Sequence, residues 1–214
     1  MTVLHHLPTF TERADLIYLW HRIKDCLQDY FIEDRKSGRY AQRIGHLARD
    51  FIDKIQKLPE FEQIIYTAQN KPRRDYPWHR YELAYDDAMQ IELVTVFGDY
   101  PTPLHSYDGP AGIIYIVQGK LRLCRYCELN HEISDFCAIT KLQCQSMDTY
   151  QSTQCTLIDS ISAPVVEMEA DSARSIFFNI HLKDHADHPH YFYYPSYLSR
   201  EKPQFFSRRV PAEW

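Results

Sequence analysis

Apolar residues recur at helical spacing through the first seventy positions of this chain. A step of three or four residues between apolar side chains is typical of a helix with one buried face. Ser37 with Gly38, and later Pro59, interrupt the pattern and divide it into three predicted helices. Thr9 and Glu12 have the spacing of a capping box ahead of the first. The apolar positions are Leu16, Leu19, Trp20, Ile23, Leu27 and Phe31 in the first, Tyr40, Ile44, Leu47, Phe51, Ile55 and Leu58 in the second, and Phe61, Ile64, Ile65 and Ala68 in the third.

After Pro77 the pattern changes to short runs rich in β-branched and aromatic residues, separated by turn residues. Such runs at regular spacing are typical of an antiparallel sandwich or barrel. The stretch from Val117 to Lys120 predicts a tight hairpin around Gly119. The clearest predicted strands are Ile91–Phe97, Gly112–Val117, Lys120–Tyr126, Thr156–Ile161 and Ser175–Leu182. The expected fold class is therefore mainly β with N-terminal helices.

Length and composition fit one globular domain. The 214 residues are 44% hydrophobic and 25% charged, which are ordinary shares for a folded domain. The pattern divides the chain into a helical segment over residues 1–72, a β-barrel over residues 73–195 and a C-terminal extension over residues 196–214. A chain of this length buries enough surface to fold without disulfide staples.

Charge and residue usage narrow the expected partners. The formal net charge of -5 argues against nucleic acid. No run of 18 apolar residues indicates a membrane span, and residues 1–10 lack the regions of a signal peptide. The six cysteines are too sparse for a disulfide framework, so we expect a cytoplasmic protein. Sixteen Tyr and eleven Phe hint at a lined cavity for a small-molecule ligand, or at a homodimer interface.

The β region resembles a known family at motif level. The segments Tyr81–Asp87, Ile91–Phe97 and Pro101–Gly119 are similar to those of the cysteine dioxygenase-like (thiol dioxygenase) cupins, and so is the order of helices before barrel. The resemblance covers roughly residues 75–182. It implies a cupin, or double-stranded β-helix (jelly-roll), barrel with a pocket inside.

The same resemblance implies a degenerate metal site. Members of this family hold iron with three histidines, of which only the first is matched here, by His105. Tyr107 and Pro164 stand at the second and third ligand positions, and Leu83 at the position of an arginine that grips thiol substrates. The family's Ser-His-Tyr relay falls on Phe177, Asn179 and His181, while a position that carries cysteine in some members and glycine in others is Gly112. We therefore expect no oxidation of free cysteine.

Three side chains remain candidates for chemistry in such a pocket. Strand alternation places Asn179 and His181 on one face, which the family pattern directs inward. His105, Tyr107 and His181 are thus the candidate catalytic residues. They are also the candidate ligands of iron, with Tyr107 bound as a phenolate, although a metal-free polar cluster is the favoured alternative. The candidate ligand-binding residues are Tyr81, Leu83, Ile114 and Asn179.

Two further clusters invite a metal interpretation. His181, His185, His188 and His190 lie within ten residues, but their spacing matches no standard site and a solvated loop is the simpler interpretation. Cys124 and Cys127, followed by His131 and Cys137, resemble a zinc pattern. Residues three apart on a strand point to opposite faces, so this pair is not expected to chelate without a bulge or turn.

Two function classes follow. One is a cysteine dioxygenase-like cupin that binds a small molecule and acts as an oxygenase-type or metal-free enzyme, with His105 or His181 in acid–base catalysis. The other is a non-catalytic cupin that binds a ligand or a partner protein. Fold alone does not distinguish between these two classes.

Overall fold

The computed structural model describes residues 10, 12–32, 38–70, 72, 77–107, 109–134, 137–159, 163–183, 191–195 and 204–211. In these described segments three helices come first and eleven strands follow. The order of three helices before a series of strands is the predicted one. The helices are α1 (Ala14–Ile32), α2 (Gly38–Ile55) and α3 (Phe61–Asn70). The strands are β1 (Trp78–Tyr85), β2 (Met89–Phe97), β3 (Leu104–Ser106), β4 (Ala111–Gln118), β5 (Lys120–Ser134), β6 (Cys137–Gln151), β7 (Cys155–Asp159), β8 (Val165–Ala170), β9 (Arg174–Leu182), β10 (Tyr191–Pro195) and β11 (Gln204–Pro211).

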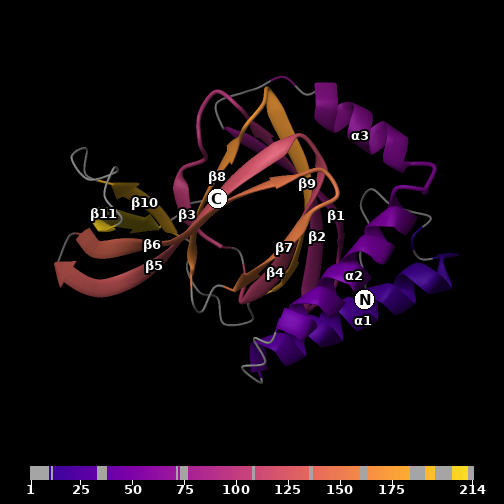
Figure 1. The fold of residues 1–214 in the computed structure, drawn as a ribbon, viewed down its shortest axis with the longest axis horizontal. Coiled ribbons are helices and arrows are strands. Elements are labelled where there is room, and N and C mark those ends of the chain that lie inside the picture. The colour runs from indigo at the N-terminus through magenta and orange to yellow at the C-terminus, as the bar shows by residue number, and fades with distance from the viewer. Residues whose placement is uncertain are drawn as a thin grey trace.

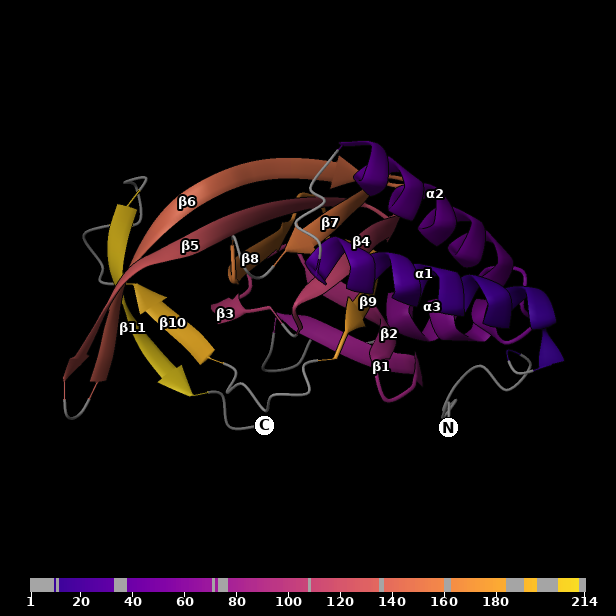
Figure 2. The same ribbon diagram turned by 90° about the horizontal axis from the view of Figure 1, so that it is seen from below.

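The strands form two antiparallel sheets. The first has the order β1-β2-β9-β4-β7, and the second closes on itself as a six-stranded barrel in the order β10-β11-β6-β5-β8-β3. The helices lie along one side of the molecule, while β5, β6, β10 and β11 extend away at the other (Figure 1). Figure 2 shows the same separation from below. The predicted class, mainly β with N-terminal helices and an antiparallel barrel, is confirmed.

Three apolar clusters follow these layers. The helices and the outer face of the first sheet share one core, in which Trp20, Phe51 and Phe178 are buried. A second cluster, the inter-sheet core, is filled by residues such as Ile116, Leu123 and Phe177. A third draws one or two residues from every strand of the closed barrel: Leu104, Cys124, Tyr126, Leu142, Val165, Tyr193 and Phe205.

A polar contact fixes α1 on the first sheet. The indole nitrogen of Trp20 donates to the Asp86 carboxylate at 2.8 Å, and Lys24 lies 3.4 Å from the same oxygen. The other Asp86 oxygen accepts the backbone N–H groups of Ala88 and Met89 in the β1–β2 turn. The Asp86 carboxylate therefore accepts hydrogen bonds from both the β1–β2 turn and α1, and links the two.

The turn at Gly119 differs from its prediction. β4 pairs with β7 and β9, whereas β5 pairs with β6 and β8, so the two strands belong to different sheets. Gly119 has a φ of 82°, where a side chain is strained, and it turns the chain from one sheet into the other. The hairpin prediction is wrong because a tight turn does not require its flanking strands to pair.

The C-terminal segment contributes a strand. β11, which lies within the predicted extension, pairs with β6 over Gln204–Arg209 and with β10 over Ser207–Pro211. In the part of the chain that the structure describes, no helix is long and apolar enough to cross a membrane.

Candidate functional site

Strand β9 carries the centre of the candidate site because its two faces meet different cores. Ile176, Phe178 and Ile180 are buried against the helices. Phe177 belongs to the inter-sheet core, and Asn179 lies on the same face two residues later. Because β9 pairs with β2 on one side and β4 on the other, this face lies at the middle of the first sheet.

Asn179 joins a chain of buried polar side chains. The Tyr107 hydroxyl donates to Asn179 Oδ1 at 2.7 Å, and Asn179 Nδ2 lies 3.4 Å from Glu92 Oε2. Glu92 and Asn179 are each only 5% exposed. Burying the Glu92 charge is costly unless it is paired. Arg80 supplies that pairing through Nη2 and Nε, at 2.7 and 3.1 Å from the same oxygen.

His181 lies at the edge of this network. Its Nδ1 is 3.1 Å from Asn179 Nδ2, and its ring meets the Tyr107 ring edge-on at 6.2 Å between centroids. The amide nitrogen can only donate, so Nδ1 is the acceptor and carries no proton. His181 thus receives a hydrogen bond from the same amide that faces Glu92.

His105 lies on β3 and stacks on Trp78, with 5.5 Å between ring centroids and 20° between planes. Its Nδ1 is 2.8 Å from the carbonyl oxygen of Pro103. A carbonyl can only accept, so Nδ1 carries the proton in this arrangement. The hydrogen bond and the stacking together hold the ring in one orientation.

The space left between the sheets is small. His105, Tyr107 and Asn179 line an inter-sheet cavity of about 30 Å³, together with Trp78, Arg80, Val94, Val96, Thr102, Met168 and Phe177. That volume accommodates water, not a ligand of several heavy atoms. Tyr107 lies directly against Gly112, where a β-carbon would overlap its hydroxyl.

These side chains do not fit a three-ligand iron site. Tyr107 uses its proton to donate to Asn179, and the His181 nitrogen nearest the network accepts from the same residue. Among the described residues, no group of three or more His, Cys, Asp or Glu side chains is arranged to hold a metal ion. Open iron sites in oxygenases rest on a facial set of three ligands.

The predicted ligand-binding residues are divided between two faces. Ile114 lies in the inter-sheet core and Asn179 lines its cavity. Tyr81 and Leu83 instead pack in the core beneath the helices, which corrects their expected position. Arg80 lines the cavity, so the alternation of side chains along β1 places Tyr81 and Leu83 on the opposite face of the strand. Leu83 therefore packs beneath the helices and does not line the inter-sheet cavity.

The sequence interpretation missed Arg80 and Glu92. Both face the inter-sheet core from neighbouring strands. The sequence did contain a signal: Glu92 is the only charged residue in the run Ile91–Phe97. A carboxylate in a buried strand needs a cation nearby.

The two other metal candidates gain no support. Cys124 is buried inside the closed barrel, where desolvation, with the nearby Glu167 charge, raises the pKa of its thiol. Cys127 instead lies beside Gln145 on the other face of β5. The side chains of His131 and Cys137 lie outside the described residues, as do His185, His188 and His190.

Comparison with known proteins gives matches at low sequence identity among solved structures. No protein-family model matches the sequence, and no curated protein matches it. A cupin superfamily protein from Desulfitobacterium hafniense is 14% identical, with a TM-score of 0.37, over 55% of this chain and 87% of its own. A cupin-2 domain-containing protein from Shewanella frigidimarina is 13% identical, with a TM-score of 0.39, over 60% and 98%. The DMSP lyase DddQ from Ruegeria pomeroyi is 10% identical, with a TM-score of 0.37, over 58% and 57%.

Proposed function

We propose that this chain is a non-catalytic cupin that acts by binding, and that its inter-sheet core is a structural element without iron-dependent oxidation chemistry. The observation that carries the proposal is the position of Tyr107. Its ring rests on Gly112, its hydroxyl donates to Asn179, and the cavity beside it is only about 30 Å³.

The polar network supports a structural role. Tyr107, Asn179, Glu92 and Arg80 use one another as partners, with Gln90 donating to the second Glu92 oxygen at 3.0 Å. A buried network whose members are satisfied specifies one packing of a core. A substrate entering here would have to break these contacts and displace an aromatic ring.

The enzyme class remains the second candidate because His105 and Tyr107 line the same cavity. In that case His105 would exchange a proton with substrate and Tyr107 would assist. Such a reaction requires Tyr107 to leave Asn179, which opens the cavity.

Oxygen consumption tests the non-catalytic proposal against the iron-dependent, oxygenase-type form of the enzyme class. Untagged protein is reconstituted anaerobically with Fe(II), mixed with cysteine and other small thiols, and followed with an oxygen electrode beside a His105→Ala variant. We expect equal background rates for both proteins with every thiol. Oxygen uptake well above background that His105→Ala abolishes would overturn the non-catalytic proposal.

A further inference from the structure

A groove of about 710 Å³ opens outside the inter-sheet core, between α2 and the edge strand β7. This volume lies in the range of small-molecule sites in proteins. Helix α2 approaches β7 so closely that a β-carbon on Gly45 would lie 3.2 Å from the Cys155 sulfur. The groove is lined by Tyr30, Ala41, Gln42, Gly45, His46, Arg49, Ile113, Arg125, Tyr150, Cys155, Thr156, Leu157, Asp159 and Ala163.

The helix side of the groove presents two unused polar groups. His46 and Arg49 lie one turn apart on α2 and both line the groove. Neither makes a hydrogen bond or ion pair with the described residues. Arg49 is close enough for its charge to lower the pKa of the Cys155 thiol, against the larger, raising effect of burial. The Arg49 charge therefore acts within the groove.

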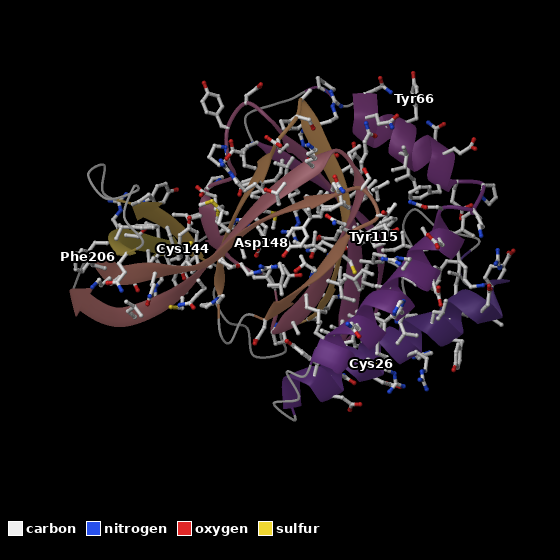
Figure 3. The ribbon with its side chains drawn as sticks, in the orientation of Figure 1. Cys26, Tyr66, Tyr115, Cys144, Asp148 and Phe206 are labelled. Carbon is white, nitrogen blue, oxygen red and sulfur yellow. The ribbon has the colours of Figure 1, made fainter. Side chains whose placement is uncertain are left out.

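The sheet side presents a second guanidinium group, which is held in place. Arg125 reaches from β5 to β7, where Nη2 donates to Thr156 Oγ1 at 2.6 Å. Nη1 donates to Ser146 and Asp148, each at 3.0 Å. The Arg125 side chain is 13% exposed, and its buried Nε has no partner. Figure 3 labels Asp148, which lies on β6, and Tyr115, which lies on β4.

The charged and apolar residues that line the groove indicate the class of ligand that it binds. Arg49 and Arg125 face a groove whose acidic lining residue is Asp159, while Asp148 already pairs with Arg125 from a half-exposed position. Ile113 and Leu157 provide an apolar floor, and Tyr30 and Tyr150 provide ring surfaces. Guanidinium groups recognise carboxylate, phosphate and sulfonate groups through paired N–H donors.

We propose that this groove binds a small organic anion, with its acidic group at Arg49 and its apolar or aromatic body on the floor formed by Ile113 and Leu157. This groove site rests on the binding role proposed above. It adds to that role a location on the protein and a class of ligand. It is separate from the inter-sheet network, which contributes none of its lining residues.

Two fluorescent probes test the site. 1-Anilinonaphthalene-8-sulfonate carries an aromatic body and an anionic group, and N-phenyl-1-naphthylamine carries the same body without the charge. Each is titrated into full-length wild type, Arg49→Ala, His46→Gln and Arg43→Ala. Arg43 is the matched control, because it is an exposed arginine of α2 that does not line the groove. Far-ultraviolet circular dichroism and thermal unfolding check that each variant is folded, since the anionic probe also reports exposed cores.

The expected result is one anionic probe per chain, with a Kd that Arg49→Ala raises by about tenfold, as for the loss of one charge-assisted hydrogen bond. His46→Gln should raise it less and Arg43→Ala should leave it unchanged. The neutral probe should bind wild type and Arg49→Ala equally. Absence of binding, or equal effects of Arg49→Ala and Arg43→Ala, would overturn the groove site. Neither outcome alters the oxygen and iron results that test the non-catalytic proposal.

Discussion

The Tyr107 hydroxyl occupies the space that a β-carbon of residue 112 would need, so the tyrosine and Gly112 depend on one another. The β-carbon would also lie 2.8 Å from the carbonyl oxygen of Ile180, which belongs to the sheet backbone and cannot move alone. Tyrosine at position 107 is therefore compatible with this core only while position 112 lacks a side chain.

Gly112→Ala should lower the free energy of unfolding by about 1–3 kcal/mol, the usual cost of overpacking a core. The double variant Gly112→Ala with Tyr107→Ala should lose less than the sum of the single variants, because one of the two clashes is gone. Urea denaturation measures all three differences. Gly45→Ala is the control, since its nearest contact is a side-chain sulfur and alanine favours the helix by up to about 1 kcal/mol. An equal loss at Gly45 would contradict this explanation.

Asn179→Ala should lower the free energy of unfolding by about 2–3 kcal/mol. It removes the acceptor of the Tyr107 hydroxyl and the amide beside Glu92, and buried groups left without partners cost about 1–3 kcal/mol. Tyr107→Phe removes only one of these bonds and should cost about 1 kcal/mol. Chemical denaturation of both variants gives the comparison. A network that does not stabilise the fold would leave Asn179→Ala within about 0.5 kcal/mol of wild type.

Asp86 should make stability depend on pH in the acid range. Burial by itself raises the pKa of its carboxyl, but hydrogen bonds from Trp20 and two backbone amides, with the charge of Lys24, outweigh burial and hold the pKa below its ordinary value. The carboxylate therefore stabilises the fold above the unfolded-state pKa of about 3.9, and this contribution is lost as the pH falls through the lower, folded-state value.

The measurement is the free energy of unfolding of wild type and Asp86→Asn between pH 3 and pH 6. The wild type should be the more stable protein near pH 6, and the difference should shrink as the pH falls below about 4. A difference that is constant across this range would show that the ionised carboxylate is not what anchors α1.

The sequence predicts a helix or strand well where an apolar pattern repeats over many residues or where the strand is buried. Apolar spacing predicted α1, α2 and α3. Alternation on β9, together with the family resemblance, predicted that Asn179 faces inward. The strand β3, with three residues, is too short to carry a periodic pattern, and β11 has Ser207, Arg208 and Arg209 at its centre in place of an apolar run.

The site was harder to predict because it depends on strand register. Motif matching placed Tyr81 and Leu83 at the pocket, whereas the register of β1 gives that face to Arg80. The groove depends on how closely Gly45 lets α2 approach Cys155, a contact between residues 110 positions apart that no local pattern encodes.

Metal content tests the central claim that the inter-sheet core is closed around Tyr107 and is not an iron site. Untagged wild type and His105→Ala are produced with added iron, purified without chelators, and analysed by mass spectrometry for transition metals per chain. The account predicts far less than one metal per chain in both proteins, with no difference between them. One metal per wild-type chain, lost in a folded His105→Ala variant, would contradict it.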